Sequence, residues 1–476
     1  MINNDSPIFS LEDVLKATAG ILVSGKPENT FCGISTDSRQ VFKGNLFIAL
    51  KGEKFDGHDF VRKTLDQGAA GIIVQEEAKL DQALTDKTIA VIKVADTLIA
   101  LGDLAHEWRK RFSIPVIGLT GSSGKTTTKE MMAAIIGRKK NILKTEGNLN
   151  NLIGMPQTIF RLNGEHELMI LEMGTNSRGE IKRLTQIAAP DIGLITNVGP
   201  AHLAGFGSID VVKEEKNDLF LNMPSSGIAI INLDDEAVTT AAERWNGRRI
   251  TFSMSPNADV TVKDIEKNGV KGVRFNLVAG GSTQRVEMKI VGLHHVYNAM
   301  AAAAAAVAVG IDQKTISEGL AAFRPFSGRM KMIRLHNGAF LLDDSYNANP
   351  ASVREALMTL KDLKIHHNGY VFLGDMLELG EEASEMHRKI GMLIATIGVN
   401  ALFLQGDFSA TTAAGAAEGG LSPQNIFFLS DSEKGIVYLK EHFKKGDWIL
   451  VKGSRRMKME KIAAQICDCF GSDEIK

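Results

Sequence analysis

The sequence predicts an α/β protein built from three domains, and three observations lead to this prediction. At 476 residues the chain is too long for one ordinary hydrophobic core. Short apolar runs alternate with helical patterns, as they do in parallel sheets covered by helices. A glycine-rich segment follows one such run near the first quarter of the chain and leads into a helix-like pattern. We therefore expect a small N-terminal α/β domain over residues 1–112, a central domain over 113–326 and a C-terminal Rossmann-like domain over 327–476.

The N-terminal and central domains are predicted from different hydrophobic patterns. In the N-terminal domain, strand-like runs at 44–50 and 71–74 are separated by a helical stretch at 60–67. From 260 to 291, alternating segments with Asn-Gly and Gly-Gly turns predict antiparallel hairpins appended to the central sheet. The alanine-rich stretch 294–309 predicts a tightly packed helix, because alanine is the best helix former. The remaining central strands are expected where both faces are apolar, as inside a parallel sheet, at 114–117, 168–171, 192–195 and 228–231.

The C-terminal domain is predicted from a renewed alternation of strand and helix patterns after Gly328. Its strands are expected at 341–342, 370–373, 401–404, 426–429 and 448–451.

The segment from Gly118 to Thr128, G-L-T-G-S-S-G-K-T-T-T, has the composition of a phosphate-binding loop. Glycines let backbone N–H groups converge on phosphate oxygens, and the following helix N-terminus adds partial positive charge. Lys125 and Thr126 can hold terminal phosphates and Mg²⁺. The general pattern G-x-x-x-x-G-K-[ST] has glycine at position 119, where this chain has leucine. We expect ATP or GTP binding by a central P-loop ATPase domain with a parallel sheet plus antiparallel hairpins, the alternative being a structural glycine-rich turn.

Polar residues follow the apolar runs of the central domain. Glu172 directly follows 168–171, and His202 lies shortly after 192–195. Ligands bind at the carboxyl edge of a parallel sheet, and a carboxylate one strand away from a phosphate loop is well placed to hold Mg²⁺. The alternatives are a helix cap or surface charge for Glu172, a structural role for His202, and a simple polar turn for the asparagine-rich segment 148–156.

Composition excludes some classes of function. The chain has 55 Lys and Arg against 56 Asp and Glu, so no overall charge favours nucleic acid or an acidic membrane. There is no basic segment followed by an apolar one at the start, and no apolar run long enough to span a bilayer. The three cysteines are expected to be free thiols. We expect a cytoplasmic protein that neither binds nucleic acid nor inserts into membranes.

The order and spacing of the motifs resemble those of the Mur ligases, which build the peptide of bacterial cell-wall precursors. The resemblance covers nearly the whole chain. It is carried by T-D-S-R at 36–39, F-D-G-H at 55–58, T-G-S-S-G-K-T-T at 120–127, G-N-L-N-N-L-I-G-M-P at 147–156, L-E-M-G at 171–174, N-V-G-P-A-H-L at 197–203, G-F-G-S at 205–208 and F-S-G-R at 326–329. Likeness to the last cytoplasmic member of the family is carried by D-D-S-Y-N-A-N-P at 343–350, L-G-D-M-L-E-L-G at 373–380 and V-K-G-S-R at 451–455.

This resemblance implies an activity and its residues. The activity would be ATP- and Mg²⁺-dependent joining of D-alanyl-D-alanine to UDP-N-acetylmuramoyl-tripeptide through an acyl phosphate, by a monomer in the bacterial cytoplasm. Catalysis would rest on Lys125, Glu172, His202, Lys216 and Arg329. Mg²⁺ would be held by Thr126, Glu172, His202 and Lys216, the last as a carbamate. ATP would be bound by Gly121, Ser122, Ser123, Gly124, Lys125, Thr126, Thr127, Asn298, Arg329, Asp344 and Asn347. The other substrates would contact Asp37, Ser38, Arg39, Asn148, Asn150, Asn151, Asn349, Ser454 and Arg455, the first three near the UDP moiety.

Two departures from the family pattern matter. The family has His-Asn where this chain reads His294-His295, and an imidazole offers one donor and one acceptor in a geometry unlike that of an amide, so we expect weaker discrimination for adenine. Lys-Asn-Asp-Leu replaces Lys-Gly-Glu-Ile at 216–219. From the residues alone, the charged neighbours of Lys216 favour a solvated helix face.

Three other functions remain as alternatives. The preceding UDP-N-acetylmuramoyl-dipeptide ligase is disfavoured because its Asp-Asn-Pro-Arg signature is absent. Folylpolyglutamate synthetase is disfavoured by the full first domain and by the motif at 343–350. A P-loop nucleotide switch without ligase activity is the third.

Overall fold

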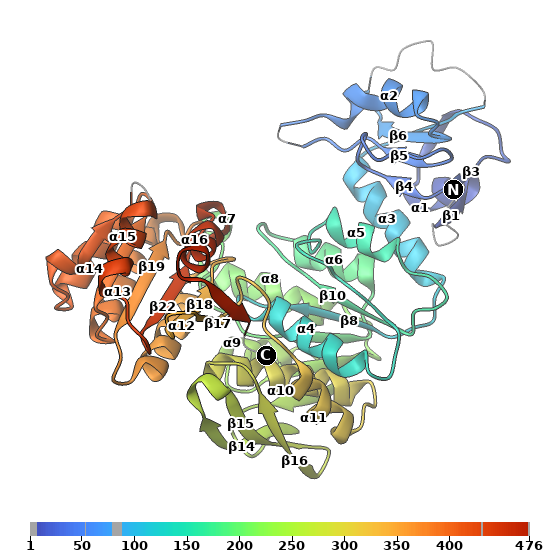
Figure 1. Ribbon diagram of the computed structural model, residues 1–476. Helices are drawn as coiled ribbons and strands as arrows, with labels where there is room; N and C mark the ends of the chain where they lie inside the picture. Colours follow the sequence, from blue (N-terminus) through green and yellow to red (C-terminus); the bar gives the residue numbers. More distant parts are fainter. Residues whose placement is uncertain (1–6, 53, 79–87, 430–431, 475–476) are drawn as a thin grey trace.

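The computed structural model describes residues 7–52, 54–78, 88–429 and 432–474. Three large sheets follow one another along the chain, each with its own helices (Figure 1). The predicted three-domain α/β architecture is confirmed. Among the described residues, none of the helices combines the length and the apolar character that crossing a membrane requires.

The N-terminal domain contains a five-stranded sheet in the order β2-β7-β6-β5-β4, and a separate antiparallel pair of β1 and β3. The predicted strands near 44–50 and 71–74 are β5 and β6, which pair in parallel, and the predicted helix is α2. The elements are β1 Ile8–Ser10, α1 Leu11–Thr18, β2 Ile21–Ser24, β3 Thr30–Cys32, β4 Ile34–Ser35, β5 Leu46–Ile48, α2 Val61–Asp66, β6 Gly71–Gln75 and β7 Ala90–Val94.

Helix α3, Thr97–Lys110, joins the N-terminal domain to the central one. Asp96 caps its first turn by accepting from the backbone N–H groups of Leu98 and Ile99. At its other end the Trp108 ring lies 5.5 Å from that of Phe9, and its Nε1 donates to the carbonyl of Leu162 in the central domain over 2.9 Å. One hydrophobic core therefore runs through both domains.

The central sheet has nine strands in the order β16-β15-β14-β13-β12-β11-β8-β10-β9. The strands from β9 to β14 run parallel, and β14, β15 and β16 form the predicted antiparallel hairpins. Helices α4, α10 and α11 share a core on one face of the sheet, and α5, α6, α8 and α9 pack on the other. The strands are β8 Val116–Thr120, β9 Ile142–Lys144, β10 Leu168–Glu172, β11 Ile192–Ile195, β12 Ile228–Asn232, β13 Arg248–Phe252, β14 Val260–Lys267, β15 Val273–Ala279 and β16 Ser282–Met288. The helices are α4 Lys125–Ile136, α5 Gly154–Ile159, α6 Glu180–Ala188, α7 Leu203–Phe206, α8 Ile209–Asn222, α9 Glu236–Glu243, α10 Leu293–Ala308 and α11 Gln313–Ala322.

The alanine-rich helix α10 lies against α4, the helix that follows the glycine-rich loop. Its alanines from Ala299 to Ala306 are fully or nearly fully buried. Small side chains let two helices approach closely, so this composition sets the distance between the loop and the polar start of α10.

The C-terminal sheet has the order β21-β20-β19-β22-β18-β17-β23. Its first five strands are parallel, as a Rossmann-like domain requires, and β17 runs antiparallel to β18. The elements are β17 Lys331–Leu335, β18 Phe340–Asp344, α12 Pro350–Lys364, β19 Gly369–Gly374, α13 Ala383–Thr396, β20 Ala401–Gln405, α14 Ser409–Glu418, β21 Ile426–Phe428, α15 Ser432–His442, β22 Trp448–Lys452, α16 Glu460–Phe470 and β23 Ser472–Glu474.

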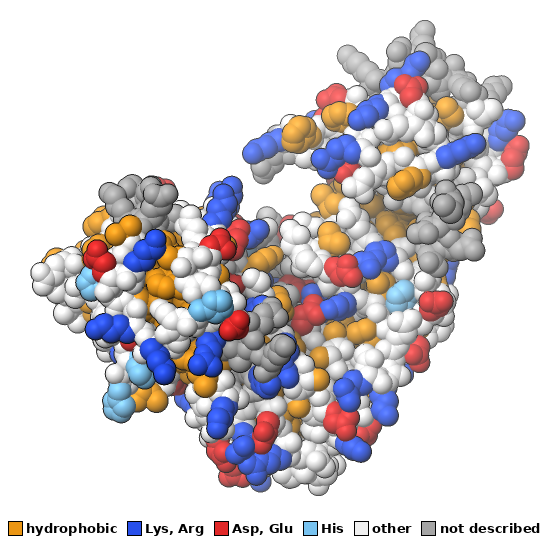
Figure 2. Space-filling model, viewed as in Figure 1, with side chains coloured by type: hydrophobic (Ala, Val, Ile, Leu, Met, Phe, Trp, Pro, Cys, Tyr) orange, Lys and Arg blue, Asp and Glu red, His pale blue; other side chains and the backbone are white. Residues whose placement is uncertain are grey.

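The surface in Figure 2 mixes acidic and basic side chains, as the nearly equal numbers of the two charge types suggest. The same view is hollowed between the N-terminal and C-terminal domains. Glu172 and Asn232, at the carboxyl ends of central strands, and Asp344 and Lys452, at the carboxyl ends of C-terminal strands, line one cavity, so the fold brings polar ends from two sheets toward one space.

Candidate active site

The glycine-rich loop connects β8 to α4 and has two positions that only glycine fits. Gly121 has φ +150°, and a Cβ on it would lie 1.9 Å from Thr196 Oγ1. Gly124 has φ +81°, and a Cβ there would lie 2.4 Å from Asn298 Oδ1. Leu119, the departure from the general pattern, is fully buried inside β8, so the loop begins only at Gly121. The departure therefore belongs to the core of the sheet rather than to the loop.

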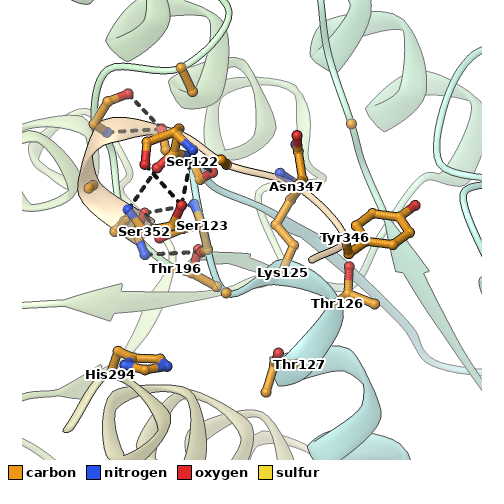
Figure 3. A pocket seen from close by; sticks show the side chains of 18 of the residues that line it. Ser122, Ser123, Lys125, Thr126, Thr127, Thr196, His294, Tyr346, Asn347 and Ser352 are labelled. Carbon is orange, nitrogen blue, oxygen red and sulfur yellow. Dashed lines mark hydrogen bonds between the residues drawn. The ribbon is translucent and has the colours of Figure 1, made fainter. Parts of the chain in front are cut away.

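Helix α4 begins at Lys125 and presents polar side chains from its first turn (Figure 3). Lys125 Nζ donates to the carbonyl of Gly121 over 2.7 Å. Burial lowers the pKa of Lys125, Glu172 opposes this shift, and the positive charge of Arg329 adds to it. Thr126 Oγ1 lies 3.2 Å from Glu172 Oε1. Lys125 and the hydroxyl of Thr126, a group that can bind a metal ion, thus lie next to the carboxylate of Glu172.

Glu172 ends β10 and is 2% exposed, so the alternative of a surface charge is wrong. Its Oε1 accepts from Asn150 Nδ2 over 3.0 Å. Its Oε2 is buried, has no hydrogen-bond partner, and lies 3.9 Å from Lys129 Nζ. A buried carboxylate oxygen without a donor is costly unless a cation completes it.

One cavity of about 890 Å³ lies beside the loop and takes its walls from the central and C-terminal domains. This volume is that of a site for a nucleotide-sized ligand. Most of the site residues expected from the sequence line it: Ser122, Ser123, Gly124, Lys125, Thr126, Thr127, Asn148, Asn150, Asn151, Glu172, His202, Asn298, Arg329, Asp344, Asn347, Asn349, Ser454 and Arg455.

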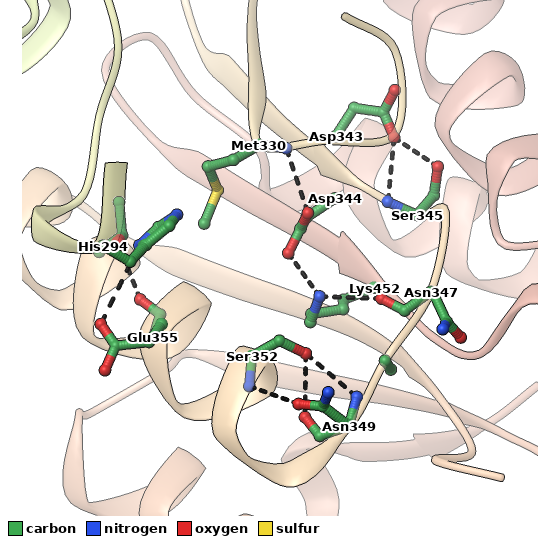
Figure 4. A network of polar contacts seen from close by, with 12 residues as sticks. His294, Met330, Asp343, Asp344, Ser345, Asn347, Asn349, Ser352, Glu355 and Lys452 are labelled. Carbon is green, nitrogen blue, oxygen red and sulfur yellow. Dashed lines mark hydrogen bonds and ion pairs between the residues drawn. The ribbon is translucent and has the colours of Figure 1, made fainter. Parts of the chain in front are cut away.

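The C-terminal wall is held by a network around Asp344 and Lys452 (Figure 4). Lys452 Nζ lies 2.5 Å from Asp344 Oδ2 and donates to the carbonyl of Asn347 over 3.0 Å. The backbone N–H of Met330 donates to Asp344 Oδ1 over 3.1 Å. Asn349 caps α12 and reaches across the domain boundary, where its Nδ2 donates to the carbonyl of Ser122 over 3.2 Å.

Arg329 also crosses between the domains. Its guanidinium lies 4.0 Å from the centroid of the Tyr346 ring, and its NH2 donates to Thr126 Oγ1 over 3.4 Å. Stacking on an aromatic face orients an arginine without neutralising it. Its charge is therefore available to an anion at the loop.

His202 directly precedes α7 and lines the cavity, with its Nδ1 2.5 Å from Glu378 Oε2 of the C-terminal domain. This hydrogen bond lowers the pKa of Glu378. Among the described residues, no three His, Cys, Asp or Glu side chains are grouped closely enough to hold a metal by themselves. A metal here would need oxygen ligands from hydroxyl, phosphate or other groups as well.

Lys216 lies on α8 and is 3% exposed, so the expectation of a solvated helix face is wrong. Burial lowers its pKa to about 7, with help from the positive charge of Lys125 and against the charge of Glu215. Glu215 does not pair with Lys216, because its carboxylate accepts from Thr175 Oγ1 and from the backbone N–H groups of Gly179 and Ile181. Within the described structure, the Lys216 amine makes no hydrogen bond or ion pair. Lys216 is not among the residues that line the cavity.

The start of α10 contributes the other end of the cavity. His295 is 2% exposed, and its Nδ1 lies 2.7 Å from the carbonyl of Val291. Burial lowers its pKa, so the ring is neutral, donates through Nδ1 and retains only Nε2 as an acceptor. The His294 ring packs 4.2 Å from it, with its Nδ1 4.0 Å from Glu355 Oε2.

Asp37, Ser38 and Arg39 do not line the cavity. They lie on the loop after β4, where Arg39 NH2 pairs with Asp37 Oδ2 over 2.7 Å and lowers the pKa of Asp37 to about 2. Gln157 Nε2 of α5 donates to Thr36 Oγ1 over 3.2 Å, which ties this loop to the central domain.

Sequence reasoning did not single out several residues that build the site. Lys129 is 1% exposed and donates to the carbonyl of Thr145 over 2.6 Å. Asn197 Oδ1 accepts from the backbone N–H of Ser123 over 3.0 Å and holds the loop. A usable signal existed for Lys129, which lies one helical turn after Lys125. It also existed for four residues that lie inside motifs noted for the resemblance: Asn197, Tyr346, Glu378 and Lys452.

Comparison with known proteins agrees with this geometry. Residues 30–109 match the Mur ligase family catalytic domain, 119–306 the Mur ligase middle domain, and 328–455 the Mur ligase glutamate ligase domain. The chain is 36% identical to the Escherichia coli (strain K12) UDP-N-acetylmuramoyl-tripeptide–D-alanyl-D-alanine ligase over 91% of this chain and 93% of that protein. Its structure resembles a crystal structure of MurF from Acinetobacter baumannii, with a TM-score of 0.88, 31% identity, and coverage of 98% and 100% of the two chains. It also resembles MurF from Thermotoga maritima in complex with ADP, with a TM-score of 0.81, 28% identity, and coverage of 92% and 97%.

Proposed function

Because this chain belongs to the Mur ligase family, we propose that its cavity is where D-alanyl-D-alanine is joined to UDP-N-acetylmuramoyl-tripeptide at the expense of ATP. The chain is an ATP-dependent ligase of peptidoglycan synthesis. The observation that carries the proposal is the shared cavity, in which the phosphate loop faces Arg329, Asp344 and Asn349 from the other side of the domain boundary.

The chemistry explains why both walls are needed. A carboxylate does not acylate an amine, because its leaving group would be oxide. Transfer of the γ-phosphoryl group to the tripeptide carboxylate makes an acyl phosphate and ADP. The amine of D-alanyl-D-alanine then attacks the carbonyl carbon, the C–N bond forms, the C–O bond to phosphate breaks, and the amine loses a proton.

The positive groups of the cavity offset the repulsion between a carboxylate and a polyphosphate. Lys125 comes from the loop and directly precedes Thr126 in the chain, and Arg329 comes from the C-terminal side and donates to Thr126 Oγ1. Charge stabilisation of this kind is the main task of a phosphoryl-transfer site. Because water would hydrolyse the acyl phosphate, approach of the C-terminal domain also protects the reaction.

The donor set fits Mg²⁺, which prefers oxygen ligands and bridges phosphates. Glu172 Oε2 is buried without a donor, and Thr126 Oγ1 lies beside the same carboxylate. Bound Mg²⁺ would neutralise charge on the phosphates. We assign Thr126, Glu172 and His202 to this role, together with Lys216 as its carbamate.

The environment of Lys216 supports carbamylation. Attack on CO₂ requires a neutral amine, and burial with a pKa near 7 supplies one at physiological pH. The product is an anionic oxygen ligand of the kind that Mg²⁺ favours. The same change removes a cationic amine from the surroundings of a metal site.

We also propose roles for the other residues of the motifs. Gly121, Ser122, Ser123, Gly124, Thr127, Asn298, Asp344 and Asn347 would bind ATP; Asp37, Ser38, Arg39, Asn148, Asn150, Asn151, Asn349, Ser454 and Arg455 would contact the other substrates. We further propose domain limits of 1–112, 113–326 and 327–476, and a monomer acting in the bacterial cytoplasm.

The test is the substrate dependence of ADP release. ADP and phosphate should form only when UDP-N-acetylmuramoyl-tripeptide and D-alanyl-D-alanine are both present with ATP and Mg²⁺, and UDP-pentapeptide should form in equal amount. Equal ATP hydrolysis without either substrate would indicate a nucleotide switch instead. Turnover with a folate and glutamate would indicate the folylpolyglutamate synthetase alternative.

A further inference from the structure

A contact between the central and C-terminal domains lies at the edge of the cavity. His202 of the central domain and Glu378 of the C-terminal domain are 176 residues apart, and His202 Nδ1 lies 2.5 Å from Glu378 Oε2. Glu378 belongs to the L-G-D-M-L-E-L-G segment, and it also lines the cavity. The activity described above uses His202 but gives Glu378 no role.

This contact decides which nitrogen of the imidazole ring carries a proton when the ring is neutral. An ionised carboxylate only accepts hydrogen bonds, so a ring nitrogen this close to it must carry the proton. A neutral ring protonated at Nδ1 has its lone pair at Nε2. In metalloproteins, a carboxylate that accepts from the second ring nitrogen of a histidine commonly orients the ring and increases its basicity toward the metal.

The backbone around the contact is built to hold it. His202 has φ 55° and Glu378 has φ 64°, both in the left-handed region that side chains other than glycine seldom adopt. The N–H of Ala204 donates to the carbonyl of Glu378 over 3.0 Å, so main chain as well as side chains cross the boundary. Two unfavourable conformations facing each other persist only where the surroundings impose them, and they are typical of functional positions.

Apolar packing follows the contact directly along the chain. Leu203 and Phe206 of α7 form a small buried cluster with Val212 of α8, and Met386 from α13 of the C-terminal domain packs against it. The cluster joins the two domains at the point where His202 and Glu378 meet. The position of Glu378 is therefore set by how the C-terminal domain docks.

We propose that Glu378 is a positioning residue for His202, holding its ring in the Nδ1–H form so that Nε2 is the nitrogen available to a divalent cation. The inference rests on the proposed role of His202 as a metal ligand. It also makes the orientation of the His202 ring depend on the C-terminal domain, because Glu378 reaches the ring only when that domain has docked. Metal binding and domain docking are then coupled through one hydrogen bond.

The experiment observes the ring directly, in protein without nucleotide. In ¹⁵N-histidine-labelled full-length protein, the His202 nitrogen signals are assigned by their loss in His202→Gln. We expect the wild type to show protonation at Nδ1, and Glu378→Ala to shift His202 toward the Nε2–H form or a mixture. Glu378→Gln should keep the wild-type pattern, because an amide oxygen also accepts from Nδ1–H. Glu381→Ala, on the following exposed turn, is the matched control and should change nothing.

A second readout links the ring to the metal. With ADP present, the dissociation constant for Mn²⁺ measured by electron paramagnetic resonance should rise about tenfold in Glu378→Ala and remain near wild type in Glu378→Gln. Glu378→Gly also removes the carboxylate, and glycine adopts a positive φ without strain. It therefore provides the same test if the alanine variant folds poorly, and it should give the result expected for alanine.

Three results would overturn the proposal. They are an unchanged His202 tautomer in both the alanine and glycine variants, the same shift in Glu381→Ala, or a shifted tautomer with unchanged Mn²⁺ affinity. If the wild-type protein does not ligate D-alanyl-D-alanine, this result would count against the proposed function alone, because the ring signals are measured without substrate.

Discussion

Replacing Lys216 by alanine should abolish most ligase activity, because it removes an amine whose burial favours the neutral form that reacts with CO₂. With an ordinary pKa of 10.5, about one lysine in a thousand would be neutral at pH 7.5; with the pKa of about 7 that burial imposes, roughly three quarters are neutral. Burial thus raises the fraction able to react with CO₂ several hundredfold. Losing the resulting metal ligand should lower kcat by about 100-fold or more, the usual effect of removing one charge-stabilising group.

The assay is ADP release coupled to UDP-pentapeptide formation, with and without added formate. Lys216→Ala should regain part of its activity with formate, because a small carboxylate can occupy the position of the missing carbamate. Lys216→Arg should stay inactive, since guanidinium keeps its charge and cannot be carbamylated. Lys213→Ala is the matched control: Lys213 lies on the same helix, is exposed and pairs with Asp210.

The reaction with CO₂ can be followed separately from activity. In ¹³C-bicarbonate buffer, a carbamate carbon signal should appear in the wild type and in Lys213→Ala but be absent in Lys216→Ala. Full activity of Lys216→Ala, or no carbamate signal in an active wild type under nucleotide and Mg²⁺, would refute the reasoning and leave Lys216 as a buried structural amine.

Three further predictions follow from single residues. Lys125→Ala should lower kcat by about 100- to 1,000-fold in the same assay, whereas the exposed Lys139→Ala should not; a wild-type rate at saturating ATP would contradict the role of the loop lysine. His295→Asn should raise the preference for ATP over GTP, measured as the ratio of the kcat/KM values, about fivefold, which corresponds to one net hydrogen bond of about 1 kcal/mol. The reason is that the imidazole Nδ1–H already donates to the carbonyl of Val291 and is not available to the base. An unchanged ratio would mean that this position does not contact the base. In CO₂-depleted buffer, Lys216→Met should raise the free energy of unfolding at pH 7 by up to about 4 kcal/mol, because the unfolded lysine binds a proton that the folded one, with its pKa lowered from 10.5 to about 7, holds only weakly. This gain should shrink as pH rises toward 10.5, and denaturant titrations at several pH values that show a constant difference would contradict it.

The phosphate loop shows which structural features can be predicted from residues that are close together in the sequence. Its strand, its glycines and the start of α4 were all predictable, because a tight turn between a buried strand and a helix needs particular residue types at neighbouring positions. The substitution at Leu119 looked like a flaw in the motif, yet the residue is simply part of β8. Deciding between these two readings required knowing where the strand ends, which sequence patterns place only within a few residues.

Lys216 shows where local sequence misleads. Its neighbours Glu214 and Asp218 are charged, which is the pattern of an exposed helix face. The lysine is buried because α8 packs against the central sheet and beside α6, and Glu215 turns its carboxylate onto the start of α6. Such burial depends on which elements pack together, so no window of sequence around the lysine contains it.

The sequence by itself determined the α/β class, the order of strands and helices, the phosphate loop and the family, because each follows from periodicity or from motifs whose residues are close in the chain. Only the tertiary structure decided that one cavity is shared by two domains, that Glu172 keeps an unpaired oxygen there, and that His202 meets Glu378. The physical reason is that desolvation and hydrogen bonding depend on groups brought together from distant parts of the chain, and the packing of whole domains determines which groups these are.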